Sequence, residues 1–222
     1  MLIELLKQPS ERDKQSKAGP SSLGSCCDRC VQRALRNEPQ PLTQYWLGAA
    51  IGTAVHAMAE KNGIRRGDPN ALLEVKVEVG DVPGYGIIKG SVDRFEIDTG
   101  TVRDYKGTTR KDKPSLLAAY DHMTPQEKEP NTHKKARLKL RNYVGQMSLY
   151  GLALSRMGYE VSSLVLEFFC RDGSGDDDIF ELEFDYDPAF AQAVWDRVVY
   201  IWTHMDEDYK AQPHCWPCEN GG

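Results

Sequence analysis

The segment GSVDRFEIDTGTVRDYKGT, residues 90–108, has the pattern of a β-hairpin. Two strand-like runs flank a central Asp-Thr-Gly, which is typical of a turn. Asp93 lies near the end of the first run, and Asp104 and Lys106 lie near the end of the second. Because side chains on a strand alternate between faces, Asp104 and Lys106 point the same way and Tyr105 points into the opposite layer. The hairpin can therefore bring two carboxylates and an ammonium group to one point.

This set of groups suits the chemistry of phosphate esters. Carboxylates hold Mg²⁺ or Mn²⁺, whose remaining positions are filled by water and substrate phosphate. Lys106 could orient or deprotonate the attacking water, or stabilise charge developing on the phosphate. The Asp-x-Lys motif alone is too short to exclude a surface ion pair of Asp104 and Lys106, with Asp93 simply favouring a turn.

Helical and alternating patterns surround the hairpin. Helices are predicted over residues 22–36, capped by Ser22, and over residues 43–62, 132–157 and 187–205. Residues 72–79, 84–97 and 101–107 predict a three-stranded meander, and residues 162–171 and 178–186 predict two more strands. Residues 110–131 are expected to form a long loop. In the second helix, Leu47, Ile51, Ala54 and Met58 form the predicted core stripe, and His56 falls outside it.

Four ordered motifs together resemble a known family. They are GTAVH at residues 52–56, GSVD at residues 90–93, DYK at residues 104–106 and QMSLY at residues 146–150. This set resembles the PD-(D/E)xK nuclease superfamily, and within it the RecB-like exonucleases, including CRISPR-associated and phage-borne members. The resemblance implies an α/β fold with a restriction-endonuclease-like core, in which helices flank a mixed central β-sheet. It also implies a Mg²⁺- or Mn²⁺-dependent DNA exonuclease.

The resemblance also assigns roles to single residues. It implies that His56, Asp93 and Asp104 ligate the catalytic metal, with the carbonyl of Tyr105, and that Lys106 serves the water and the scissile phosphate. Gln146 and Tyr150 then face the active site and contact DNA. Their spacing of four places them on one helix face, and His56 is not needed in the core. A solvated His56 and a Tyr150 in the ordinary core are the alternative readings, and Glu74 is a further candidate that a solvent-facing strand position explains equally well.

A basic stretch begins the predicted helix at residues 132–157. Lys134, Lys135, Arg137, Lys139 and Arg141 could follow a DNA backbone, or form a solvated charged face. The formal net charge of −5 does not indicate a nucleic-acid binder, but a metal site made of carboxylates is itself acidic.

The cysteines form two pairs near opposite ends of the chain. Cys27 and Cys30, and Cys215 and Cys218, each have the Cys-x-x-Cys spacing that lets two thiolates hold one metal. Four thiolates fit Zn²⁺ or an iron–sulfur cluster. The resemblance favours a 4Fe-4S cluster, although members of the family place one cysteine before the core and three after it, and here two lie on each side. Cys26 competes with Cys27, and Cys170 is expected to be a buried hydrophobe.

These expectations combine into one picture. Residues 1–21 form a polar, flexible segment and residues 22–222 a single nuclease domain, with a catalytic core at about 43–185 and a cysteine cluster from 26–30 and 215–218. No membrane span or signal peptide is expected, so we expect a cytoplasmic location. The cell would be bacterial or archaeal, and a phage-encoded protein is compatible with this expectation. The expected partner is DNA, bound at its ends or as single strands. The expected pathways are recombination, repair, phage DNA processing or CRISPR adaptation, and proteins of recombination or CRISPR adaptation are candidate protein partners. The alternatives are an inactive, nuclease-derived DNA-binding or adaptor subunit, and a zinc-bound interaction module.

Overall fold

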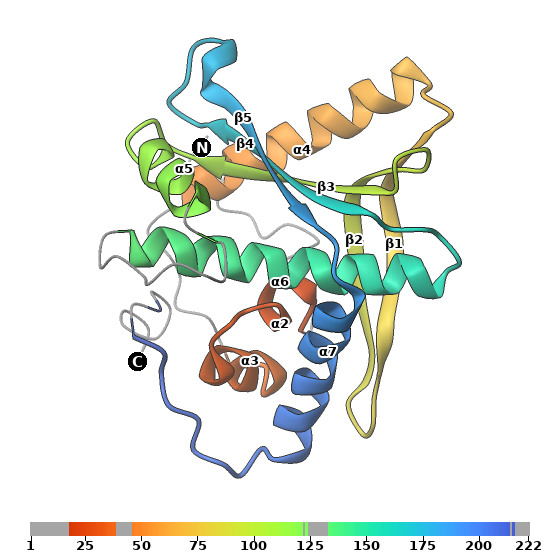
Figure 1. Cartoon of the computed structure of the whole chain (residues 1–222), viewed down its shortest axis with the longest axis vertical. Coiled ribbons are helices and arrows are strands. Elements are labelled where there is room, and N and C mark those ends of the chain that lie inside the picture. Colours follow the sequence, from red (N-terminus) through yellow and green to blue (C-terminus); the bar gives the residue numbers. More distant parts are fainter. Residues whose placement is uncertain (1–17, 39–45, 122, 124–132, 214, 216–222) are drawn as a thin grey trace, which may run out of the picture.

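A twisted central sheet organises the computed structural model, which describes residues 18–38, 46–121, 123, 133–213 and 215 (Figure 1). The sheet has five strands in the order β1-β2-β3-β4-β5. β3 and β4 are parallel and the other neighbours are antiparallel, so the sheet is mixed. The strands are β1 (Ala71–Val82), β2 (Gly86–Glu96), β3 (Thr101–Thr108), β4 (Ser163–Cys170) and β5 (Ile179–Asp185).

Helices flank this sheet, as the sequence predicted. They are α2 (Pro20–Leu23), α3 (Asp28–Leu35), α4 (Trp46–Arg66), α5 (Lys113–Asp121), α6 (Lys134–Arg156) and α7 (Pro188–Thr203), with a 3₁₀ turn η1 (Asp176–Asp178). The parallel pair β3–β4 requires a crossover connection, and that connection contains α5 and α6. α6 packs on strands β1 to β4 and also contacts α2 and α7, which lie below α6 in Figure 1.

The two sides of β3 face different helices. The ring of Tyr105 packs edge-on against His56 of α4, with ring centroids 5.7 Å apart. The side chains of Asp104 and Lys106 reach Gln146 of α6. Since neighbouring residues of a strand point to opposite faces, α4 and α6 lie on opposite sides of this part of the sheet. The predicted alternation of Asp104, Tyr105 and Lys106 is confirmed.

The core lies between the sheet and α6. Residues 145–154 of α6 are all buried, because this half of the helix has the sheet on one side and α2 and α7 on the other. Val92, Phe95, Leu166 and Phe168 bring strand side chains to the same core. The predicted helix at 187–205 is confirmed: the Asp187 carboxylate accepts the N–H groups of Ala189 and Phe190 and thereby caps α7.

Two predicted elements were wrong in detail. The helix expected at residues 22–36 is two short helices separated by Gly24–Cys27, so Ser22 lies inside α2 and Cys27 takes the N-cap position of α3. Gly24, at the start of this break, packs directly against α6: a β-carbon there would lie 2.2 Å from the backbone nitrogen of Gln146. The expected loop at 110–131 contains α5, whose Leu116 and Ala119 are buried against the core.

The predicted core stripe of α4 was also wrong. Leu47 is 51% exposed and Met58 58% exposed, and Ala54 is exposed as well. Ile51 is partly buried, together with Val55, His56 and the glycines Gly52 and Gly63. The spacing of the apolar residues in α4 thus does not identify the side of the helix that faces the sheet. That side borders a pocket rather than the core. Among the described residues, no helix has the length and apolar character needed to cross a membrane.

Candidate active site

A pocket of about 830 Å³ opens where α4, the meander and α6 meet. Its wall includes His56 from α4, Asp93 from β2, Asp104–Lys106 from β3, and Gln146 and Tyr150 from α6. Residues 19–21, at the start of α2, close another side. The seven residues expected to form the centre of the site therefore line one pocket, although they come from four elements.

His56, Asp93 and the Tyr105 backbone form one half of the site. Asp93 Oδ1 lies 3.3 Å from His56 Nδ1, and His56 Nε2 lies 2.9 Å from the carbonyl oxygen of Tyr105. The N–H of Tyr105 donates to Asp93 Oδ2 at 2.9 Å. Asp93 is 6% exposed. The imidazole of His56 thus contacts a carboxylate and a backbone carbonyl, and these are the three ligand types that the resemblance implied.

Asp104, Lys106 and Gln146 form the other half. Lys106 Nζ lies 2.5 Å from Asp104 Oδ2 and donates to Gln146 Oε1 at 3.2 Å. The amide nitrogen of Gln146 donates to Asp104 Oδ1 at 3.1 Å and to the Tyr150 hydroxyl at 3.2 Å. With its oxygen toward an ammonium and its nitrogen toward a carboxylate, the amide of Gln146 satisfies both groups. Gln146 and Tyr150 therefore face the site together, from one side of α6.

The charges of this pocket influence one another strongly. Burial raises the pKa of Asp104, and the nearby charge of Asp93 adds to that rise, although Lys106 opposes it. Burial also acts to raise the pKa of Asp93, but the hydrogen bond and charge of His56 outweigh it and the pKa of Asp93 is lowered. Burial acts to lower the pKa of Lys106, but the charge of Asp104 outweighs it and the net shift is upward. The two carboxylates thus occupy different electrostatic environments although both are buried.

Glu74 joins the first half of the site. Its carboxylate, His56 and Asp93 each offer one ligand atom, and these three atoms lie within 4.8 Å of one another. The Ser91 hydroxyl donates to Glu74 Oε2 at 2.7 Å, and Glu74 has a left-handed backbone with φ of 45°, which is uncommon for a residue other than glycine. Asp104 is not in that group of three. Two carboxylates and an imidazole nevertheless form a donor set that fits Mg²⁺ or Mn²⁺.

The basic residues at the start of α6 differ in their exposure to solvent. Arg137 is 5% exposed, so it lies inside the fold rather than on an exposed basic face. Lys134 is half-buried and Lys135 is exposed. Lys139 Nζ lies 5.9 Å from the centre of the Tyr143 ring. The basic stretch is therefore not one continuous surface.

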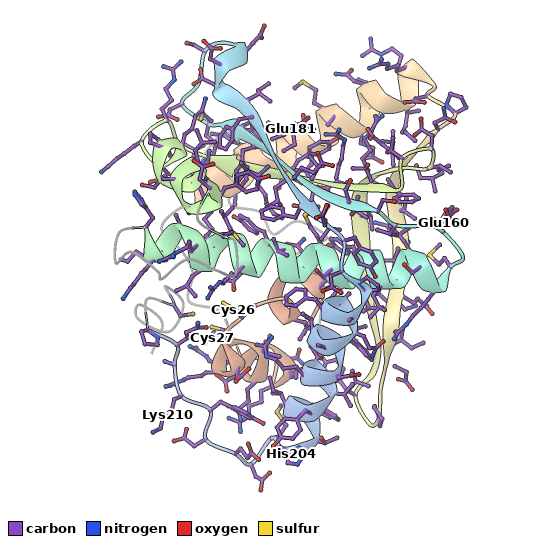
Figure 2. The ribbon with its side chains drawn as sticks, in the orientation of Figure 1. Cys26, Cys27, Glu160, Glu181, His204 and Lys210 are labelled. Atoms are coloured by element: carbon purple, nitrogen blue, oxygen red, sulfur yellow. The ribbon has the colours of Figure 1, made fainter. Side chains whose placement is uncertain are left out.

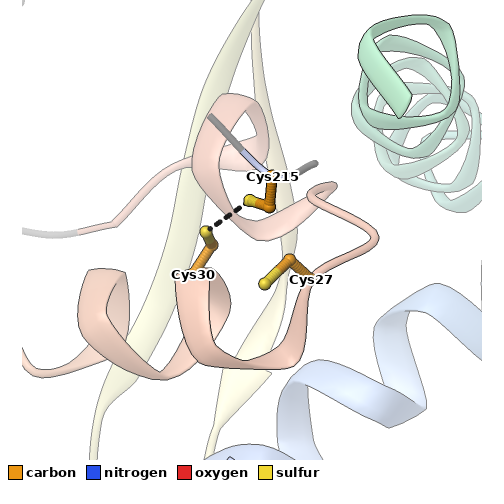
Figure 3. A group of neighbouring side chains, drawn as sticks. All are labelled: Cys27, Cys30 and Cys215. Atoms are coloured by element: carbon orange, nitrogen blue, oxygen red, sulfur yellow. Dashed lines mark hydrogen bonds between the residues drawn. The ribbon is translucent and has the colours of Figure 1, made fainter. Parts of the chain in front are cut away.

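Three of the predicted cysteine ligands meet between α3 and the C-terminal segment (Figure 3). The sulfurs of Cys27, Cys30 and Cys215 lie within 4.8 Å of one another, and those of Cys30 and Cys215 are 3.3 Å apart. The backbone N–H of Gln212 donates to the Cys27 sulfur at 3.5 Å. Cys218 lies outside the described residues. Three converging thiols fit a thiolate-bound metal or cluster, which agrees with the predicted junction of the N- and C-terminal segments.

Cys26 and Cys170 lie outside this group of three. Cys26 and Cys27 both lie in the link between α2 and α3, as Figure 2 shows, but only Cys27 belongs to the group of three. The N–H of Cys26 donates to the side-chain oxygen of Asn142 on α6 at 2.8 Å. Cys170 is buried at the end of β4, as predicted.

Sequence reasoning missed two residues beside the site, Tyr143 and Arg171. Lys106 Nζ lies 4.8 Å from the centre of the Tyr143 ring. The spacing of Tyr143 and Gln146 on one helix could have indicated a shared face. Arg171 directly follows β4, and no local pattern marks it.

A model of the PD-(D/E)XK nuclease superfamily matches residues 2–220 of this chain. The fold is similar to that of SSO0001, with a TM-score of 0.50 and 18% identity over 90% of this chain and 87% of that chain. It is also similar to LHK-Exo, an alkaline exonuclease from Laribacter hongkongensis, with a TM-score of 0.52 and 12% identity over 86% of this chain and 88% of that chain. LHK-Exo in complex with dAMP gives a TM-score of 0.51 and 13% identity over the same shares. No curated protein matches by sequence.

Proposed function

The chain belongs to the PD-(D/E)XK nuclease superfamily, and we propose from this premise that it is a metal-dependent DNA exonuclease of the RecB-like type. The observation that carries the proposal is the meeting of His56, Asp93 and the Tyr105 carbonyl with Asp104 and Lys106 in one pocket. The similarity of the fold to an alkaline exonuclease, and to its complex with dAMP, supports the choice of DNA as substrate. Such a nuclease would act in recombination, repair, phage DNA processing or CRISPR adaptation.

His56, Asp93, Glu74 and Asp104 are the residues that would hold Mg²⁺ or Mn²⁺. When bound there, the ion supplies a Lewis acid for the phosphate oxygen and lowers the pKa of a water molecule. Both oxygens of the Asp104 carboxylate are engaged, one by Lys106 and one by Gln146, so Asp104 would ligate the ion only after these contacts rearrange.

Lys106 is the group that acts on the water and on the scissile phosphate. Its ammonium is held by Asp104 on one side and by the oxygen of Gln146 on the other. The side chain of Lys106 is 16% exposed, so its charge acts in a largely water-excluded site where electrostatic stabilisation of a phosphate is stronger. Gln146 fixes Lys106 and Asp104 relative to each other and does no chemistry itself.

The cysteine cluster has a structural role in this proposal. Cys27 and Cys30 lie near one end of the described chain and Cys215 at the other, so a shared metal would close a loop of nearly the whole domain. By analogy with a covalent crosslink of such a loop, the constraint on the unfolded chain is worth about 4 to 5 kcal/mol. A 4Fe-4S cluster is the favoured occupant and Zn²⁺ the alternative. Visible absorbance of a brown protein supports the cluster, and a colourless protein that contains zinc supports the alternative.

Linear and covalently closed circular DNA of the same sequence test the proposal. An exonuclease degrades the linear molecule in the presence of Mg²⁺ or Mn²⁺, leaves the circle intact and is inactive in excess chelator. Cutting of the circle at a similar rate contradicts the exonuclease assignment. Absence of cutting by pure protein in either metal supports an inactive DNA-binding or adaptor subunit, and zinc with no DNA binding supports an interaction module.

A further inference from the structure

Strand β1 is irregular at Glu74. Leu72 and Val75 both pack against the core although they are three residues apart, whereas regular alternation brings residues two or four apart to one face. Their partners on β2, Phe95 and Val92, are also three residues apart and also in the core. The left-handed backbone of Glu74, with a φ of 45°, accounts for the change of face on β1. Such a backbone costs free energy in a residue other than glycine and is found most often at functional sites.

The irregularity leaves the carboxylate of Glu74 outside the core and opposite Asp93. The residues on either side of Glu74 pair with Arg94 and Val92 of β2, so Asp93 is its cross-strand neighbour. One ligand atom from each of these two carboxylates and one from His56 lie within 4.8 Å of one another. Two carboxylates directly opposite each other on neighbouring strands repel. The orientation of the Glu74 carboxylate therefore depends on the groups that donate hydrogen bonds to it.

The hydroxyl of Ser91 is one such donor. It donates to Glu74 Oε2 at 2.7 Å and accepts from Lys76 Nζ at 3.1 Å. An ammonium can only donate, so Lys76 takes a lone pair of the hydroxyl and leaves its single hydrogen for Glu74. Ser91 and Lys76 are partners across β1 and β2, and both line the pocket. The register of the two strands thus fixes the direction in which Ser91 donates.

The next pair along the same face of these strands is different. Lys89 Nζ lies 3.0 Å from Glu78 Oε1, but both side chains are more than half exposed. An ion pair in water of this kind contributes little to stability. Ser91 is instead half-buried, and it lies two residues before Asp93 on β2. One strand therefore supplies Asp93 itself and the group that holds Glu74.

We propose that Ser91 is a positioning residue of the metal site, whose hydroxyl holds Glu74 in the orientation that ligates the ion. The inference rests on the proposed function and adds a residue that acts on the ion only through Glu74. Groups that hydrogen-bond to a metal-binding carboxylate orient it, and their removal weakens metal binding about 10- to 100-fold. In this role Ser91 contacts neither the ion nor the DNA.

The test measures the Kd of Mn²⁺ without DNA, from the electron paramagnetic resonance signal of the free ion. Ser91→Ala should raise this Kd at least about tenfold, because Glu74 Oε2 loses its donor. Ser91→Thr and Ser91→Val have nearly the same shape and both suit a strand, but only threonine keeps the hydroxyl. Ser91→Thr should therefore bind Mn²⁺ as wild type does, and Ser91→Val should match Ser91→Ala. Asp93→Asn identifies the Mn²⁺ that is bound at this site.

Two control variants should keep the wild-type Kd. Ser163→Ala removes a half-buried strand hydroxyl that hydrogen-bonds with Thr101 Oγ1 across β4 and β3 at 3.1 Å, away from the residues that line the pocket. Lys61→Ala removes a charge from an exposed position of α4 that does not line the pocket. Circular dichroism of each variant in chelator shows whether it is folded at the temperature of the titration.

A double variant tests whether Ser91 acts through Glu74. Adding Ser91→Ala to Glu74→Ala should weaken Mn²⁺ binding no further, because the acceptor is already gone. An equal further loss in that background contradicts the positioning role. If Ser91→Ala and Ser91→Val bind Mn²⁺ as Ser163→Ala does, while wild type degrades DNA with metal, the positioning role is wrong and the nuclease function stands. If wild type neither binds Mn²⁺ at Asp93 nor degrades DNA, the proposed function fails and the role of Ser91 fails with it.

Discussion

Gln146 and Asp104 are joined by a hydrogen bond of 3.1 Å, which the amide nitrogen of Gln146 donates to Asp104 Oδ1. Both side chains are buried, and they come from a helix and a strand that are 42 residues apart. The same amide accepts from Lys106. Gln146 therefore determines how the carboxylate and the ammonium of the site are oriented, and its removal tests that dependence.

Gln146→Ala leaves a buried Asp104 oxygen without its donor, at a cost of about 1 to 3 kcal/mol. If the cost falls on the transition state, the rate of DNA cleavage falls about 10- to 100-fold. Single-turnover kinetics measure this rate of cleavage. Gln192→Ala, which removes an amide on α7 that donates to Asp196, should leave the rate unchanged. Equal rates in wild type and Gln146→Ala would rule out the positioning role.

Replacing each of two helical glycines, Gly145 of α6 and Gly52 of α4, by alanine should change the free energy of unfolding in opposite directions. A β-carbon at Gly145 would lie 2.2 Å from the carbonyl oxygen of Gly24, whereas one at Gly52 meets nothing within 4 Å. Gly145→Ala should therefore lower the free energy of unfolding by about 2 kcal/mol or more, because α2 and α6 must separate. Gly52→Ala should raise it by about 1 kcal/mol through helix propensity. Denaturant titration measures both, and a stable Gly145→Ala protein would contradict the close packing of α2 on α6.

The sequence predicted most of the fold because its strands and the α7 cap rest on local patterns. Alternation marks the meander, and Asp187 and Pro188 mark the start of α7. The failures arose where distant contacts outweigh local pattern. The first helix is interrupted where Gly24 packs on α6, and the spacing of apolar residues in α4 did not mark its sheet-facing side, where His56 borders a pocket.

The site was predictable to a similar extent. Ordered motifs predicted His56, Asp93, Asp104, Lys106 and Gln146, and the structure places all of them in one pocket. Tyr143 and Arg171 carried no motif, since only the tertiary arrangement places them beside Lys106 and Gly107. Arg137 has the same charge as its neighbours in the sequence, and its burial could not be read from the basic stretch.

The cysteine cluster should hold its metal through Cys30. Cys30→Ser should lose metal, measured by elemental analysis, and should lower the melting temperature, since the bound metal links the ends of the domain. Cys170→Ser is the control for metal content, because Cys170 lies at the end of β4 outside the group of three thiols. Metal-free wild type, or full metal content in Cys30→Ser, would refute the assignment.

The loop after β4 should loosen in acid. Arg110 holds the Asp178 carboxylate through two hydrogen bonds, which together with the N–H groups of Ser174 and Gly175 lower the pKa of Asp178. A lowered folded-state pKa gives stability that is complete above the unfolded value of about 3.9 and is lost as pH falls through the folded value. The difference in melting temperature between wild type and Asp178→Asn should therefore be constant at pH 5 to 7 and shrink below about pH 4. A difference that grows in acid would have the wrong sign.

The most direct test of the nuclease site is the degradation of end-labelled DNA by wild type, Asp93→Asn and Lys106→Ala. With Mg²⁺ or Mn²⁺, wild type and the Lys61→Ala control should degrade the DNA at the same rate. Asp93→Asn and Lys106→Ala should lose activity at least 100-fold, because they remove a metal ligand and the charge at the phosphate. If all four proteins degrade DNA equally, the pocket of His56, Asp93, Asp104 and Lys106 is not the catalytic site.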